Sequence, residues 1–166
     1  MTAVNLIHSF CRTGAIRSIK VNIVGEAVAP GTYTLSSLAT LFNALYAAGG
    51  VNDIGSLRNI KVYRNSKEIA SLDVYDYLLN GKYETNIRLE DNDMIIIGPY
   101  EQLVTAGGKV KRDRTYELRR GETLDDLLDM AGGFTGDAYT GSIRVKRKAG
   151  DRYKIATVNE EQFQTF

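Results

Sequence analysis

Apolar and polar residues alternate near the start of the chain and then change their period. Residues 19–24 read I-K-V-N-I-V and alternate between apolar and polar residues up to Ile23, which predicts a half-buried strand. Pro30 and Gly31 are typical of a turn, and residues 31–35 predict a second short strand. Apolar residues then recur at the i, i+3, i+4, i+7 spacing of one helix face, at Leu41, Ala44, Leu45 and Ala48.

The following residues complete one folding unit. A double glycine after Ala48 is typical of a helix C-terminus. Residues 59–64 and 68–74 predict two strands, residues 75–79 a short helix and residues 94–97 a buried strand. This order favours one helix lying across a mixed sheet, so we predict a β-grasp-like α+β domain.

The pattern occurs twice, with an offset of 83 residues that places Tyr33 over Tyr116. Thirteen of the 40 positions from Gly25 to Arg64 carry the same residue 83 positions later, whereas chance would give about two or three. In the second copy, Thr123 and Asp126 fit a capping box at the helix start. We therefore predict two tandem domains, residues 19–100 and 101–166, preceded by a tail or fragment end at residues 1–18.

The second copy is shorter than the first. Adding 83 to residues 94–97 gives 177–180, beyond residue 166. We expect the last strand of the second domain to be missing and the chain to be a piece of a longer protein. An uncovered strand edge is adhesive, so the isolated chain is expected to dimerise through it.

Composition narrows the function classes. Of 166 residues, 43% are hydrophobic and 25% charged, as in soluble globular proteins, and the net charge of +1 demands no strongly charged partner. A single cysteine excludes an internal disulfide, and residues 1–10 contain no Lys or Arg of a secretory signal. This N-terminus does not argue for the cytoplasm, because the chain is expected to be a fragment.

The sequence offers no catalytic or metal-binding constellation. His8 and Cys11 supply only two ligands, fewer than the four of a structural zinc site. Asp125 and Asp126 are adjacent on a predicted helix and therefore point to different faces. The double glycines follow helices, whereas phosphate-binding loops precede them. We predict no enzyme activity, no cofactor and no metal.

Four segments together resemble the SLBB (soluble-ligand-binding β-grasp) domains of bacterial polysaccharide export proteins. They read V-N-I-V-G-E-A-V-A-P-G-T-Y-T-L at residues 21–35, T-L-F-N-A-L-Y-A-A-G-G at 40–50, I-K-V-Y-R at 60–64 and L-E-D-N-D-M-I-I-I at 89–97. The second copy resembles the domain less closely, because Asp113-Arg114 replaces the Pro-Gly turn.

The resemblance implies a structural and oligomerisation module in the periplasm and outer membrane of a Gram-negative bacterium. It implies a homo-oligomeric ring that conducts a polysaccharide and an inner-membrane copolymerase as partner. We expect no nucleic acid partner, and only weak glycan contact, because tight binding would slow release. A small-molecule-binding module of the cobalamin type is the main alternative and requires a preformed apolar pocket. A nucleic-acid-binding module requires salt-dependent binding through basic residues, and a carbohydrate-active enzyme requires paired carboxylates in a cleft.

Tyrosine suits sugar contact because its ring has an apolar face and its hydroxyl can hydrogen-bond. The candidates crowd one stretch of the first domain: Tyr63, Tyr75, Tyr77 and Tyr83. The sequence favours the competing interpretation, in which these tyrosines are ordinary half-buried strand residues. Tyr33 and Tyr116, at equivalent positions, are predicted to pack structurally.

Two basic clusters are candidate contacts for an anionic polymer. The first comprises Lys109, Lys111, Arg112, Arg114, Arg119 and Arg120, and the second comprises Arg144, Lys146, Arg147 and Lys148. Residues 99–166 hold 12 basic and 11 acidic residues. The sequence therefore favours a solvated surface on which these cations are balanced by Glu117, Glu122, Asp125, Asp126 and Asp129.

Overall fold

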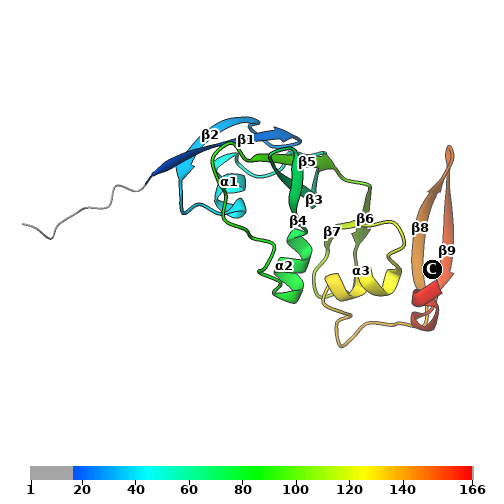
Figure 1. Cartoon of the computed structure of the whole chain (residues 1–166). Helices are drawn as coiled ribbons and strands as arrows, with labels where there is room; N and C mark the ends of the chain where they lie inside the picture. Colours follow the sequence, from blue (N-terminus) through cyan, green and yellow to red (C-terminus); the bar gives the residue numbers. More distant parts are fainter. Residues whose placement is uncertain (1–16, 166) are drawn as a thin grey trace, which may run out of the picture.

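The structure, a computed structural model, describes residues 17–165 (Figure 1). His8 and Cys11 therefore lie outside the described residues. The first domain follows the predicted order: β1 (Ser18–Gly25), β2 (Gly31–Ser36), α1 (Leu41–Ala47), β3 (Gly55–Arg64), β4 (Lys67–Leu72), α2 (Val74–Asn80) and β5 (Met94–Pro99). The five strands form one sheet in the order β2-β1-β5-β3-β4, in which only the β1–β5 pair is parallel. The mixed sheet with one main helix is confirmed.

The core of this domain lies between α1 and the sheet. Alternate residues of the strands point inward and are fully buried, and the apolar stripe of α1 packs on them. The main members of this core are Val21, Ile23, Leu41, Ala44, Ile60, Val62, Ile95 and Ile97.

The second domain repeats these elements up to its last strand. It consists of β6 (Gln102–Ala106), β7 (Arg114–Leu118), α3 (Leu124–Met130), β8 (Ile143–Ala149), β9 (Arg152–Val158) and the 3-10 helix η1 (Glu160–Thr165). Its own small core contains Tyr116, Leu118, Leu127, Met130 and Ala131.

The repeat extends to individual hydrogen bonds. The hydroxyl of Tyr33 donates to the carbonyl of Ala29 at 2.5 Å, and that of Tyr116 donates to the carbonyl of Arg112 at 2.8 Å. All four residues obey the 83-residue offset. The duplication is thus confirmed at atomic level, and both tyrosines have the structural role predicted for them.

Helix termini are built alike in the two domains. The side chain of Asn43 accepts from the N–H of Thr40 at 2.9 Å, and that of Asp126 accepts from the N–H of Thr123 at 2.7 Å. Both double glycines have positive φ, at 77° and 86° for Gly49-Gly50 and at 80° and 85° for Gly132-Gly133. They therefore end helices, as the sequence predicted, because only glycine adopts this conformation freely.

The two domains differ in how their hairpins are joined. In the first, β5 lies between β1 and β3, whereas β6–β7 and β8–β9 form two separate two-stranded sheets. No strand among residues 17–165 takes the place of β5 in the second domain. Consequently the β8–β9 hairpin stands out beyond α3 (Figure 1). The following η1 packs against α3, and the Phe163 ring lies 6.2 Å from that of Phe134.

Candidate functional site: the junction between the two domains

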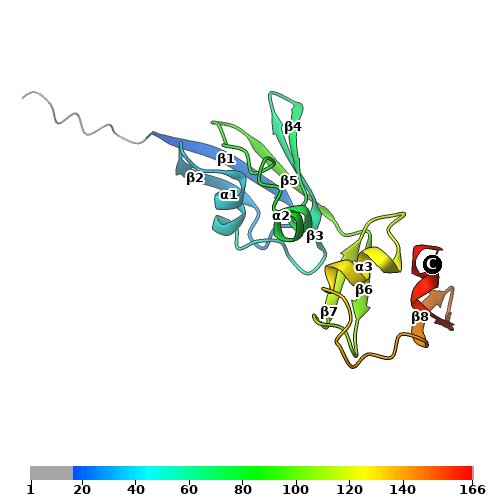
Figure 2. The same cartoon turned by 90° about the horizontal axis from the view of Figure 1, so that it is seen from below.

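The two domains are joined by a short connection and an arched strand. Only Tyr100 and Glu101 separate β5 from β6. In β3, Gly55 pairs with Pro99 and the next pair is Ile60 with Ile97, so four residues of β3 oppose one of β5. This irregularity directs residues 56–58 at the second domain, and Figure 2 shows the domains in contact at this end of β3. The contact between domains is as predicted.

Arg58 lies at the centre of the junction, and its side chain is 7% exposed. Its guanidinium donates to both carboxylate oxygens of Glu122 at 2.6 and 2.7 Å, and its Nε donates to Asp73 at 3.0 Å. Its Nη1 also donates to the carbonyl of Glu117 at 3.0 Å. Burial lowers the pKa of Arg58, but the hydrogen bonds to Glu122 and Asp73 outweigh burial and raise that pKa above its ordinary value.

Asp73 connects this charge network to a helix. It is the N-cap of α2, and its carboxylate accepts from the N–H of Tyr75 at 2.8 Å. The same carboxylate pairs with Arg119 of the second domain at 3.1 Å. Arg119 also donates to the carbonyl of Arg58 at 2.7 Å, so both arginines cross-link β3, α2 and the turn after β7.

Glu117 on β7 forms a second link to the arched part of β3. Its carboxylate accepts from the hydroxyl of Ser56 at 2.5 Å and from the N–H of Leu57 at 2.9 Å. Its N–H donates to the hydroxyl of Tyr75 at 3.0 Å. Burial raises the pKa of that tyrosine, and the hydrogen bond from Glu117 partly opposes the rise. Buried charges that are paired and hydrogen-bonded in this way tolerate few alternative geometries.

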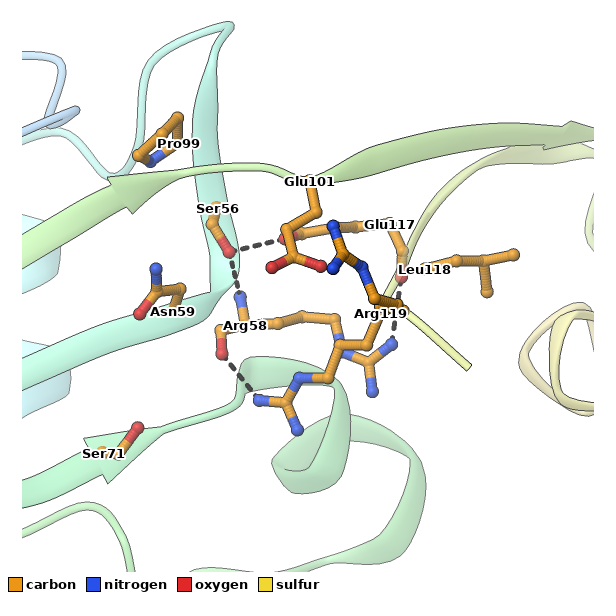
Figure 3. Close-up of a pocket in the computed structure, with 10 residues that line it drawn as sticks. Ser56, Arg58, Asn59, Ser71, Pro99, Glu101, Glu117, Leu118 and Arg119 are labelled. Atoms are coloured by element: carbon orange, nitrogen blue, oxygen red, sulfur yellow. Dashed lines mark hydrogen bonds between the residues drawn. The ribbon is translucent and has the colours of Figure 1, made fainter. Parts of the chain in front are cut away.

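A hollow of about 390 Å³ lies beside this network (Figure 3). Of its lining residues only Pro99 and Leu118 are apolar, and the others include Ser56, Asn59, Ser71, Glu101, Arg119 and Arg120. Small-molecule sites are lined mainly by apolar and aromatic side chains. The hollow therefore does not favour the cobalamin-type alternative.

The four candidate tyrosines lie in three separate places. Tyr75 belongs to the junction, beneath the Arg58 guanidinium at 5.1 Å, and the hydroxyl of Tyr63 donates to Glu68 at 3.2 Å. Tyr77 stacks obliquely on Phe42 and on Tyr83, with ring centroids 4.6 and 6.0 Å apart. Of the four, only Tyr77 and Tyr83 form a joint aromatic surface.

The prediction that acidic side chains of the second domain balance both basic clusters is wrong for the second cluster. Glu117 and Glu122 are bound to partners at the junction, Asp126 closes the capping box of α3, and Asp125 and Asp129 also lie on α3. Within residues 17–165, none of Arg144, Lys146 and Lys148 forms an ion pair. The first cluster is partly paired, since Lys109 contacts Asp137 at 2.5 Å and Arg119 pairs with Asp73.

Sequence reasoning missed the junction itself. It began the third strand at residue 59 and so left Ser56, Leu57 and Arg58 in a loop.

The described part of the chain has no group of three or more metal-ligating side chains. Nor does it contain a helix whose length and hydropathy would suit a membrane span.

Two copies of a helix-on-sheet unit, locked together through buried charges, define a tandem β-grasp module. SLBB domain models match residues 19–97 and residues 103–156. The chain belongs to the SLBB domain family, as its motifs indicated.

Curated relatives extend the comparison to whole proteins. Two Escherichia coli proteins, each described as "Polysialic acid transport protein KpsD", are 34% identical to this chain over 134 residues. The match covers 80% of this chain and 23% of each relative. The chain thus corresponds to about a quarter of the length of these proteins.

Proposed function

We propose that this chain is the SLBB part of a polysaccharide export protein and serves there as a rigid structural and assembly module. The observation that carries the proposal is the 34% identity, across both domains, to proteins described as polysialic acid transport proteins. The junction supports it physically, because a wall element of a conduit must keep a fixed shape. The arginines and carboxylates of the junction restrict the orientation of the two domains.

The proposal includes location, partners and the absence of catalysis. The module acts in the periplasm and outer membrane of a Gram-negative bacterium, within a homo-oligomeric ring that cooperates with an inner-membrane copolymerase. It scaffolds passage of the polymer and performs no chemistry. Its contacts to the glycan are weak, because tight binding would slow release.

The function is tested by removing the coding region of both domains from the organism that encodes them. We expect surface polysaccharide, measured as acid-released sugar on washed cells, to fall by about tenfold or more while polymer accumulates inside the cell. A wild-type copy supplied in trans is the control and restores the surface polymer. Unchanged surface polysaccharide in cells that lack the domains would contradict the proposal.

The aromatic surface formed by Tyr77 and Tyr83 is the remaining candidate for glycan contact among the predicted tyrosines. The Tyr83 side chain is 60% exposed, so its ring face is available to a sugar. We expect Tyr83→Ala to weaken polysaccharide binding about two- to tenfold at any salt concentration, because aromatic contacts do not depend on charge. Saturation-transfer NMR measures this effect, with Tyr46→Ala as the control, because Tyr46 is even more exposed than Tyr83 and lies outside the stacked pair. Equal losses in both variants would remove Tyr83 from the site.

A further inference from the structure

The β8–β9 hairpin carries a local excess of positive charge within the second domain. Residues 143–158 contain six basic residues and one acidic residue, Asp151, a net charge of +5 in a chain whose total is +1. All six basic side chains are exposed. They are Arg144, Lys146, Arg147, Lys148, Arg152 and Lys154.

The strand register gathers part of this charge on one face. Arg144, Lys146 and Lys148 alternate along β8 and therefore point to the same side. Their partners on β9 are Thr157, Ile155 and Tyr153. The Lys146 ammonium lies 4.2 Å from the Tyr153 ring centroid, and Tyr153 is 63% exposed. We call these four residues, Arg144, Lys146, Lys148 and Tyr153, the cationic strip.

The corresponding face of the first domain, on β3, has its positive charge paired with a carboxylate. Lys61 and Tyr63 on β3 are the counterparts of Arg144 and Lys146 under the 83-residue offset. There, Lys61 pairs with Glu68 at 3.0 Å and Tyr63 hydrogen-bonds to the same carboxylate. No carboxylate pairs with the corresponding residues of the second domain within the described residues. The unpaired charge is therefore particular to the second domain and is no general consequence of the fold.

We infer that the cationic strip binds an anionic polysaccharide, an inference that rests on the proposed function and adds its substrate class. Unpaired arginine and lysine side chains attract carboxylates, and Arg144 can hold one through two parallel hydrogen bonds. The strip runs along β8 from Arg144 to Lys148, which is four residue steps or about 13 Å at 3.3 Å per residue, so it contacts more than one sugar unit. Tyr153 adds an apolar ring face beside the charges.

Charge and shape favour this partner over other polyanions. The hairpin tip carries Asp151 next to Gly150 and has no large apolar side chain that would enter a membrane. Nucleic-acid binding draws on many phosphate contacts and a strongly basic domain, whereas this chain has a net charge of only +1. The relatives described as polysialic acid transport proteins act on an anionic glycan.

Binding of the full 166-residue chain to polysialic acid, and to alginate as a second carboxylated polymer, tests the inference. The site variant is Arg144→Gln, Lys146→Gln and Lys148→Gln combined. The control variant is Lys20→Gln, Lys67→Gln and Arg88→Gln, which removes the same charge from exposed, unpaired positions of the first domain. We expect the affinity of the site variant to be at least about tenfold lower than that of the wild type, and that of the control variant to be less than about twofold lower. The affinity of the wild type is also expected to fall at least about tenfold in 0.5 M salt.

Several results would overturn the inference. These are no binding to either polymer at low salt, equal losses in the two triple variants, equal binding to neutral dextran, or tighter binding to a single-stranded oligonucleotide or to anionic vesicles. Circular dichroism shows whether the variants keep their fold. If surface polysaccharide depends on the two domains while neither polymer binds the strip, the inference fails and the proposed function stands.

Discussion

Replacing Arg58 with leucine is expected to lower the free energy of unfolding by about 3–5 kcal/mol, the range for removing one partner of a buried ion pair. Leucine fills much of the volume but supplies no charge, so Asp73 and Glu122 lose the cation that binds both. Arg58→Lys is expected to recover only part of the loss, because an ammonium cannot reproduce the forked geometry. Urea unfolding followed by circular dichroism measures both variants.

The same substitution is expected to loosen the domains relative to one another. Spin labels at exposed positions of the two domains report the distribution of interdomain distances, which should broaden in Arg58→Leu. The matched control is Arg64→Leu, since Arg64 pairs with Asp93 at 2.8 Å wholly within the first domain. That control should lose stability but keep a narrow distribution. A narrow distribution in Arg58→Leu would contradict the structural role assigned to the junction.

Alanine at Gly25 is expected to destabilise the first domain by about 3 kcal/mol or more, combining backbone strain with a steric clash. Gly25 has φ of 85°, which alanine rarely adopts. A Cβ atom there would also collide with the carbonyl oxygen of Ile97 on β5, and this backbone cannot move without disturbing the central strand.

The repeat supplies the control for this prediction. Gly108 is the counterpart of Gly25 and has φ of 91°, yet a Cβ atom there would meet nothing within 4 Å. We expect Gly108→Ala to cost only about 1 kcal/mol, the strain of the backbone alone. Urea titrations of the two variants compare these values. Equal losses would show that the contact with β5 has no energetic importance.

The contrast between the two glycines follows from the sheets. In the first domain β5 runs parallel to β1 and pairs with it at Gly25, so the glycine accommodates a close backbone approach. Around Gly108 no described strand occupies that position. The same residue thus has different energetic importance in two copies of one unit.

The sequence by itself determined the elements and their repetition. Helix faces, capping boxes and glycine termini depend on residues within a few positions of one another, so local periodicity and residue type reveal them. The 83-residue repeat then predicted the second domain, and its elements agree with the structure.

Only the tertiary structure decided which residues of the two domains contact one another. Ser56 and Glu117 are 61 residues apart in sequence, and Arg58 and Glu122 are 64 apart. No periodicity signals such a contact, because it depends on the extra residues that arch β3 toward β7. For the same reason the acidic residues expected to balance the β8–β9 hairpin lie at the junction or on α3: charge counted along a chain does not say which charges face one another.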